Sequence, residues 1–120
     1  IAQYLKTNSH IRHVFYPGLV DHPGHAIARA QMPGGFGGML SFELNTDAHQ
    51  FMSKLKLIKR AISLGGVEST ITSPARTSHS KMSASERLSI GVTENLVRLS
   101  VGIEDSNDLI DDIQQALPRG

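Results

Sequence analysis

The sequence predicts an α+β domain in which helices pack on one face of a mainly antiparallel sheet of about four strands. Two observations indicate this class. Four segments of strand length are apolar or alternate strictly, and amphipathic segments with helical spacing lie between them. The order is mixed, with no internal repeat and no second domain boundary, so 120 residues are expected to form one domain.

The first elements are predicted to be a helix, a strand and a second helix. Apolar residues at helical spacing in residues 1–5 indicate a helix already under way where the sequence begins. Residues 11–16 are rich in β-forming residues and end at a Pro-Gly turn. A second helix is expected to begin at residues 21–23, where proline suits the first turn, and to end at residues 33–35.

A strand, a helix and another strand are predicted next. Residues 38–44 alternate between apolar and polar side chains, as in a strand with one buried face. Thr46 can cap a helix whose apolar residues repeat at helical spacing as far as Leu55. Residues 57–64 are interpreted as a strand.

The last third predicts helix, strand and helix. Ser83 and Glu86 have the spacing of a capping box, so a short helix is expected to end at Gly91. Residues 96–101 form an apolar strand. The final helix ends before Pro118 and carries one apolar stripe, made of Leu109, Ile110, Ile113 and Leu117.

Arg98 stands in the middle of this last strand. Alternation places Arg98 and Ser100 on one face and Val97 and Leu99 on the other. A half-buried strand face rarely carries an arginine unless that charge has an anionic partner. From the residues alone, that partner is either a structural carboxylate or the carboxylate of a ligand.

Composition excludes several classes of function. Twelve lysines and arginines against eleven acids give a net charge of +1, which provides no field to attract nucleic acid or an anionic membrane. The absence of cysteine excludes disulfides and thiolate metal sites and fits a reducing cytoplasm. There is no apolar run of membrane-spanning length and no visible signal peptide. His22 and His25 lack a third ligand in the sequence, so no metal site is predicted.

Four short segments, spread along nearly the whole chain, are distinctive when taken together: YPGL at 16–19, GFGGMLSF at 35–42, SLGGVES at 63–69 and LVRLSVGIED at 96–105. Together they resemble the C-terminal domain of the Cys/Met-metabolism family of pyridoxal-phosphate enzymes. This family includes cystathionine synthases and lyases, methionine γ-lyase and homoserine-ester sulfhydrylases. The resemblance implies that residues 1–120 are the small C-terminal substrate domain of a fold-type I transferase, cut from a longer chain with an N-terminal cofactor domain.

The resemblance also implies a site. Arg98 would bind the α-carboxylate of the substrate, with Ser63 and Leu64 beside it. Ser63 precedes Arg98 by 35 positions, as in the family. The alternative for Ser63 is a serine that closes a turn at a strand end. Glu68 and His79 belong to a polar stretch that passes near the active-site mouth in the family, although turn and cap roles explain such residues equally well.

Position 62 bears on the substrate. Family members that act on cystathionine often carry glutamate immediately before SLGG, whereas this chain has Ile62, which is either a specificity residue or an ordinary core isoleucine. The segment GFGGMLSFEL resembles cystathionine γ-synthases, which implies γ-replacement on an activated homoserine ester with cysteine. The alternatives are cystathionine β- or γ-lyase and methionine γ-lyase or, from another class, a non-catalytic ferredoxin-like module that binds an amino acid.

The five lysines do not occur in the S-x-T-K segment that carries the family's Schiff-base lysine. The resemblance therefore implies that pyridoxal 5'-phosphate is bound by the N-terminal domain and that this chain alone is inactive. The implied partners are a small amino-acid substrate, the chain's own cofactor domain and further copies in a homotetramer.

Overall fold

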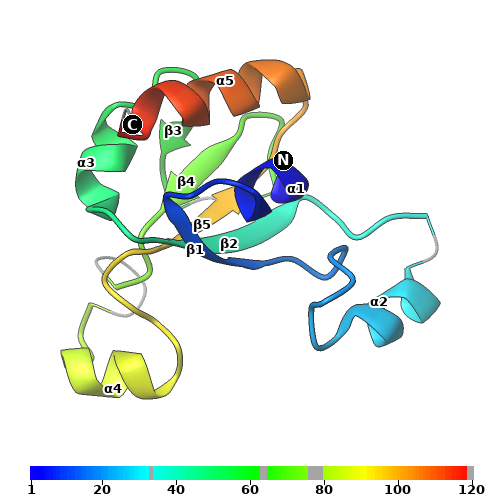
Figure 1. The fold of residues 1–120 in the computed structure, drawn as a ribbon, viewed down its shortest axis with the longest axis horizontal. Helices are drawn as coiled ribbons and strands as arrows, with labels where there is room; N and C mark the ends of the chain where they lie inside the picture. Colours follow the sequence, from blue (N-terminus) through cyan, green and yellow to red (C-terminus); the bar gives the residue numbers. More distant parts are fainter. Residues whose placement is uncertain (33, 63–64, 76–79, 119–120) are drawn as a thin grey trace.

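A computed structural model describes residues 1–32, 34–62, 65–75 and 80–118. It contains a five-stranded sheet in the order β1-β2-β5-β4-β3 (Figure 1). All neighbouring strands pair antiparallel except β3 and β4, which are parallel. The strands are β1 (Ile11–Phe15), β2 (Met39–Leu44), β3 (Lys59–Arg60), β4 (Thr70–Thr72) and β5 (Leu96–Ser100). The predicted Arg98 strand, β5, is therefore the central one.

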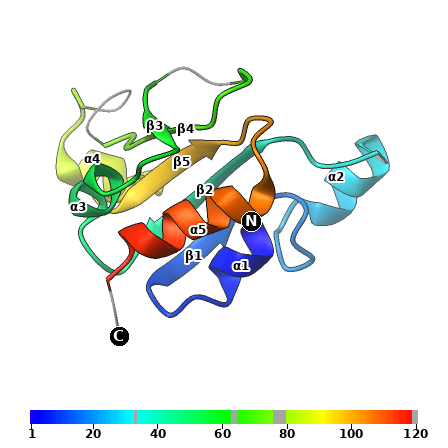
Figure 2. The ribbon, with the colours of Figure 1, turned by 90° about the horizontal axis from the view of Figure 1, so that it is seen from above.

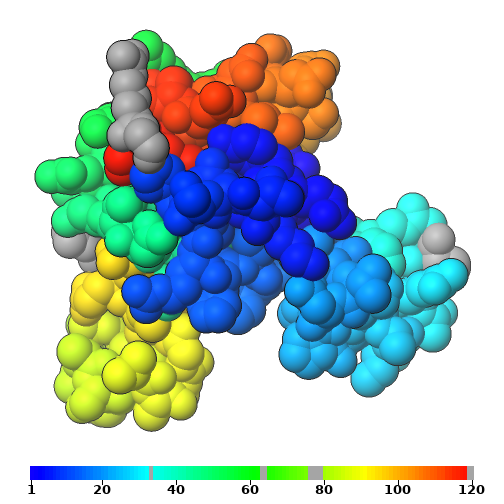
Figure 3. Space-filling view, viewed as in Figure 1, coloured from blue at the N-terminus to red at the C-terminus, as the bar shows by residue number. Residues whose placement is uncertain are grey.

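Five helices accompany the sheet in the described part of the chain. They are α1 (Ala2–Lys6), α2 (His25–Gln31), α3 (Ala48–Ser53), α4 (Ala84–Ser89) and α5 (Ser106–Ala116). Figures 1 and 2 show α1, α3 and α5 gathered over one side of the sheet. By contrast, α2 and α4 stand away from the body at opposite ends and form two separate lobes in Figure 3. The predicted α+β class, with helices on one face of a mainly antiparallel sheet, is confirmed.

The core lies between the sheet and these three helices. Alternation along β2 sends Leu40, Phe42 and Leu44 to this side, and all three are buried. Phe42 packs edge-to-face against Phe51 of α3, with 6.0 Å between the ring centroids. The predicted stripe of α5 closes the core through Leu109, Ile113 and Leu117.

One buried carboxylate ties α5 to the loop that precedes β3. Asp112 accepts hydrogen bonds from the backbone amides of Lys56, Leu57 and Ile58, at 2.8, 2.9 and 2.8 Å. Gln115, one turn further along α5, donates to the same carboxylate at 3.0 Å. The segment that leads from α3 to β3 is therefore held in place by α5, the helix that covers it.

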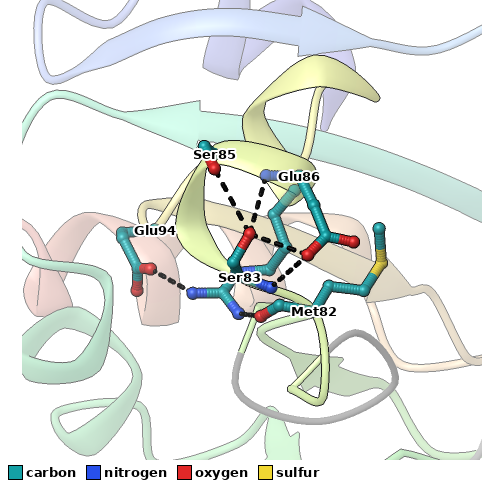
Figure 4. Close-up of polar contacts among 6 residues, drawn as sticks. Met82, Ser83, Ser85, Glu86 and Glu94 are labelled. Carbon is teal, nitrogen blue, oxygen red and sulfur yellow. Dashed lines mark hydrogen bonds and ion pairs between the residues drawn. The ribbon is translucent and has the colours of Figure 1, made fainter.

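The helix α4 holds itself together by polar contacts and buries none of its residues. The predicted capping box is present: Ser83 Oγ accepts from the Glu86 amide at 3.2 Å, and the Glu86 carboxylate accepts from the Ser83 amide at 3.4 Å (Figure 4). The guanidinium of Arg87 donates to the Met82 carbonyl and pairs with Glu94 at 2.8 Å. These polar contacts stabilise α4, which has no side packed against the core.

Two strand predictions are corrected. The strand expected at 57–64 is reduced to Lys59–Arg60, and the next strand in the sheet, Thr70–Thr72, was not predicted. This strand is only three residues long and two of them are threonine, so the sequence resembles a polar loop. All three residues are nevertheless buried, because β4 is sandwiched between β5 and β3.

Two helix starts are also corrected. The helix expected from residues 21–23 begins at His25, because residues 19–25 form successive turns and Asp21 pairs with Lys6 at 3.0 Å. The cap of α3 is Asp47, not Thr46, and its carboxylate accepts from the Gln50 amide at 3.0 Å. Among the described residues, no helix has the length and apolar character needed to cross a membrane.

Candidate functional site

The side of the sheet away from the core is a polar face that surrounds Arg98. Directly paired residues of neighbouring strands point to the same side, and Arg98 is paired with Ser41 of β2 and Thr72 of β4. We call this side the open face. It carries His13, Phe15, Met39, Ser41, Glu43, Thr70, Thr72, Leu96, Arg98 and Ser100. The prediction that Arg98 and Ser100 share a face opposite Val97 and Leu99 is confirmed.

Arg98 is half-buried at the centre of the open face. Its Nη2 donates to the backbone carbonyl of Ile62 at 3.0 Å. The ion pairs among the described residues join Lys6 to Asp21, Arg12 to Glu43 and Arg87 to Glu94, so no described carboxylate pairs with Arg98. The guanidinium has five N–H donors, and this one backbone contact leaves most of them available to an anion.

The loop that joins β3 to β4 is fastened beside Arg98. The amide of Gly65 donates to the Ser100 hydroxyl at 2.9 Å, on the same face of β5. Ser63 and Leu64 lie outside the described residues, but their neighbours on both sides, Ile62 and Gly65, are hydrogen-bonded to β5 side chains. The segment that carries the predicted substrate contacts is therefore attached at both ends to the open face.

The far end of this loop is clamped at the exit of β5. Ser69 is fully buried; its amide and hydroxyl donate to the Glu104 carboxylate at 2.9 and 2.8 Å. The Ser69 hydroxyl also accepts from the Gly102 amide at 2.8 Å. The hydrogen bond from the Ser69 amide lowers the pKa of Glu104 and outweighs the opposing effect of burial. A structural carboxylate thus fixes the loop.

Position 102 requires glycine, because the loop between β3 and β4 approaches the backbone closely at this point. A Cβ at this position would lie 2.2 Å from the Val67 carbonyl oxygen and 2.7 Å from the carbonyl carbon of Glu68. Both are backbone atoms, which no rotamer change can move away. The glycine in LSVGIED therefore lets the loop lie directly against the chain that leaves β5.

Three further predicted site residues have different outcomes. Ile62 is 68% exposed, so its interpretation as an ordinary core isoleucine is wrong. Its carbonyl binds Arg98, and its side chain borders a cavity of about 220 Å³ that is also lined by Thr72 and Met52. Glu68, next to Ser69 in the sequence, is exposed. His79 lies outside the described residues.

A second cavity, of about 320 Å³, lies elsewhere, between the start of the chain and the aromatic residues Tyr16 and Phe36. Beside it, His25 stacks on Phe36 with 5.4 Å between ring centroids and has Nδ1 2.7 Å from the Pro17 carbonyl. His25 is therefore engaged in holding the α2 lobe. No group of three or more metal-binding side chains occurs within the described ranges.

Residues 1–118 match the family model described as Cys/Met metabolism PLP-dependent enzyme. The chain belongs to this family. Its members in cysteine and methionine metabolism use pyridoxal phosphate, and the match extends over both the open face and the core side of the fold.

Individual relatives carry several activities in their names. Cystathionine gamma-lyase of Bacillus subtilis is 45% identical over 98% of this chain and 31% of its own length. Cystathionine gamma-synthase 1, chloroplastic, of Nicotiana tabacum is 46% identical over 98% of this chain and 22% of its own length. Proteins named cystathionine beta-lyase and L-methionine gamma-lyase match at 46% and 43%. Identity alone does not separate these four activities.

The fold is shared with solved members of the family. The crystal structure of the cystathionine gamma-lyase CalE6 from Micromonospora echinospora superposes with a TM-score of 0.92 at 40% identity, over 99% of this chain and 32% of that one. The chain thus spans about a third or less of the length of the relatives it matches.

Sequence reasoning missed part of the site. The offset of 35 positions noted between Ser63 and Arg98 recurs in two observed contacts, Gly65 with Ser100 and Ser69 with Glu104. The backbone nevertheless runs antiparallel to β5 here, because the Ile103 amide donates to the Val67 carbonyl at 2.9 Å and Thr70 pairs with Ser100. The equal offset is thus not the register of a strand pair, and SLGGVES and LVRLSVGIED carry no signal that marks Ser100 and Glu104 as loop contacts.

Proposed function

We propose that this chain is the C-terminal substrate domain of a longer pyridoxal-phosphate enzyme and that Arg98 binds the α-carboxylate of an amino-acid substrate on the open face. The observation that carries the proposal is an arginine at the centre of a sheet with no acidic partner among the described residues. A guanidinium presents a planar fork that binds a carboxylate through two parallel hydrogen bonds. The contact with the Ile62 carbonyl restrains that fork.

In this proposal Arg98 acts by positioning. Fixing the carboxylate of an amino acid also fixes the direction of the bonds at its Cα, which is where this family's chemistry begins. Ser63 and Leu64 are proposed to lie against the same carboxylate. Glu68 and His79 are proposed to contribute at the mouth of the site.

The residues of this chain do not by themselves fit the cofactor. All five lysines are exposed, and Lys59, the lysine within the sheet, lies on edge strand β3, two strands from Arg98. A lysine that forms a Schiff base is usually activated by a desolvated or strongly charged site. We therefore propose that the cofactor, which supplies the electron sink for the reaction when bound, is held by an N-terminal domain.

The open face is proposed to pack against that cofactor domain. Exposed apolar side chains occur on this face and in the loop beside it, including Phe15 on β1 and Val67. Apolar groups around a polar site are typical of a surface covered by another domain. A homotetramer is proposed for the full-length protein.

Among the family reactions, we propose γ-replacement on an activated homoserine ester with cysteine, as in cystathionine γ-synthase. The GFGGMLSFEL segment favours it, whereas the cystathionine lyases and methionine γ-lyase remain the alternatives. Assaying the full-length enzyme with a homoserine ester plus cysteine, with cystathionine and with methionine distinguishes them. A higher kcat/KM for elimination from cystathionine or methionine would contradict the synthase assignment.

The carboxylate role is tested by Arg98→Ala in the full-length enzyme. Removing a charge-assisted contact worth about 2–4 kcal/mol should lower kcat/KM by about 10²–10³, at about 1.4 kcal/mol per factor of ten. Arg98→Lys should restore only part of the loss, because an ammonium cannot reproduce the fork. The cofactor absorbance should survive both changes. If Arg98→Ala unfolds the protein while the remaining folded enzyme keeps its substrate affinity, Arg98 is structural.

A further inference from the structure

The loop between β3 and β4 is held by alternate residues of β5 and its exit. Contacts come in sequence from Arg98, Ser100, Gly102 and Glu104, which reach residues 62, 65 and 69 of the loop. Alternate residues of an extended chain point to the same side. Arg98 and Ser100 of one strand therefore hold the start of the loop, at residues 62 and 65, on the open face.

Ser100 occupies the position in this series closest to the proposed carboxylate site. It is only 3% exposed, and its hydroxyl accepts the Gly65 amide at 2.9 Å. Gly65 has a φ of +75°, a conformation that glycine tolerates and that turns the chain sharply at this point. The Ser100 bond thus fixes the loop where its direction changes.

Two contacts hold the loop on either side of residues 63 and 64. The Ile62 carbonyl restrains Arg98 Nη2, and the loop that carries this carbonyl is restrained at Gly65 by Ser100. Loss of the Ser100 hydroxyl would leave the Gly65 amide without this acceptor and would free the loop to shift. The position of the Ile62 carbonyl, and with it the orientation of the guanidinium, would then be less well defined.

We propose that Ser100 is a positioning residue for the substrate-carboxylate site, acting through Gly65 and Ile62 on the guanidinium of Arg98. This inference rests on the proposed function of Arg98. It assigns no contact with substrate to Ser100. Its effect should be seen in how well the enzyme binds and orients a carboxylate.

The experiment measures kcat and KM of the full-length enzyme in a double-mutant cycle of Ser100→Ala and Arg98→Ala. In the wild-type background, Ser100→Ala should lower kcat/KM about tenfold, the order expected for the loss of one hydrogen bond. In the Arg98→Ala background, it should have little further effect, because the group it positions is gone. Ser100→Thr, which keeps the hydroxyl, should restore most of the activity.

Ser53→Ala is the matched control. It removes one hydroxyl that donates to a backbone carbonyl, that of Gln50 at 2.7 Å, but on α3 at the core side of the sheet. Kinetics should be unchanged in this variant. Thermal unfolding of every variant separates a loss of folded protein from a change at the site.

The outcomes distinguish the two proposals. An equal fall in both backgrounds would mean that Ser100 acts independently of Arg98 and would overturn the inference. A normal Ser100→Ala enzyme alongside an impaired Arg98→Ala enzyme would also overturn it and would leave the proposed function intact. If neither variant is impaired, the carboxylate role of Arg98 itself is wrong.

Discussion

At the scale of single residues, Gly102 makes the sharpest stability prediction. Its φ is not in the positive range, so the backbone itself would accommodate alanine, and the added Cβ would be opposed by the backbone atoms of Val67 and Glu68 and by the Glu104 carboxylate. Overpacking of this kind costs about 1–3 kcal/mol. We expect Gly102→Ala to lower the free energy of unfolding by that amount, as measured by urea denaturation.

Gly66, in the loop that Gly102 contacts, supplies the control. A Cβ there meets nothing within 4 Å, and its φ is not positive either. Gly66→Ala should therefore leave the stability unchanged or raise it by up to about 1 kcal/mol, because alanine restricts the unfolded chain. Equal destabilisation by the two substitutions would mean that the close approach at Gly102 is not what limits this position.

Residue-level reasoning from the sequence succeeded where a pattern is local. The alternation in LVRLSV correctly predicted which face Arg98 and Ser100 occupy, and the Ser83–Glu86 spacing predicted a real capping box. For Ile62 it left two interpretations open, and the core one is wrong: an apolar residue is most often buried, and nothing in the sequence indicates that this one is exposed two residues after a short edge strand. Hydrophobicity alone does not reveal the exposure.

At the scale of elements, Asp112 couples α5 to the loop before β3 and should make stability depend on pH. Burial by itself would raise the pKa of Asp112, but the amides of Ile58, Lys56 and Leu57 together outweigh it, and the pKa is lowered. The unfolded chain therefore takes up a proton at higher pH than the folded one. The stabilisation is complete above the unfolded pKa of about 3.9 and is lost as the pH falls through the lower folded value.

Asp112→Asn should lower the free energy of unfolding at neutral pH by about 2 kcal/mol or more, since three backbone amides lose a charged acceptor. It should also flatten the decline in stability below pH 4. Asp111→Asn removes the same charge from the neighbouring, exposed position and should change neither. If the free energy of unfolding declines below pH 4 in the same way in wild type and in Asp112→Asn, another group causes the decline.

The two strand predictions that failed share one cause. Helices with a long apolar stripe, such as α5, and strands with strict alternation, such as β2, carry their own signal. The three-residue β4 and the two-residue β3 do not, because β4 is buried by the strands on either side of it and both residues of β3 are exposed. The three amides bound by Asp112 are likewise invisible in sequence, since backbone donors more than 50 positions away leave no residue signature.

At the scale of the whole molecule, the two faces of the sheet have different roles. One face supports a closed core with α1, α3 and α5, and the other presents Arg98 and a loop that is hydrogen-bonded to β5 side chains. The central strand serves both, because its alternate residues belong to the core and to the open face. A change on the open face can therefore alter the site while the core remains intact.

This separation predicts that the isolated 120-residue chain folds but does not bind the cofactor covalently. The closed core should give a cooperative unfolding transition by circular dichroism. All five lysines are exposed, whereas a lysine amine becomes a strong nucleophile where it is desolvated or next to another cationic group. Adding pyridoxal phosphate should therefore give no stable Schiff-base absorbance band, whereas the full-length enzyme should show one. Mass spectrometry after borohydride reduction provides the check: stoichiometric labelling of one lysine among residues 1–120 would mean that the cofactor site lies in this chain, and our assignment of it to another domain would be wrong.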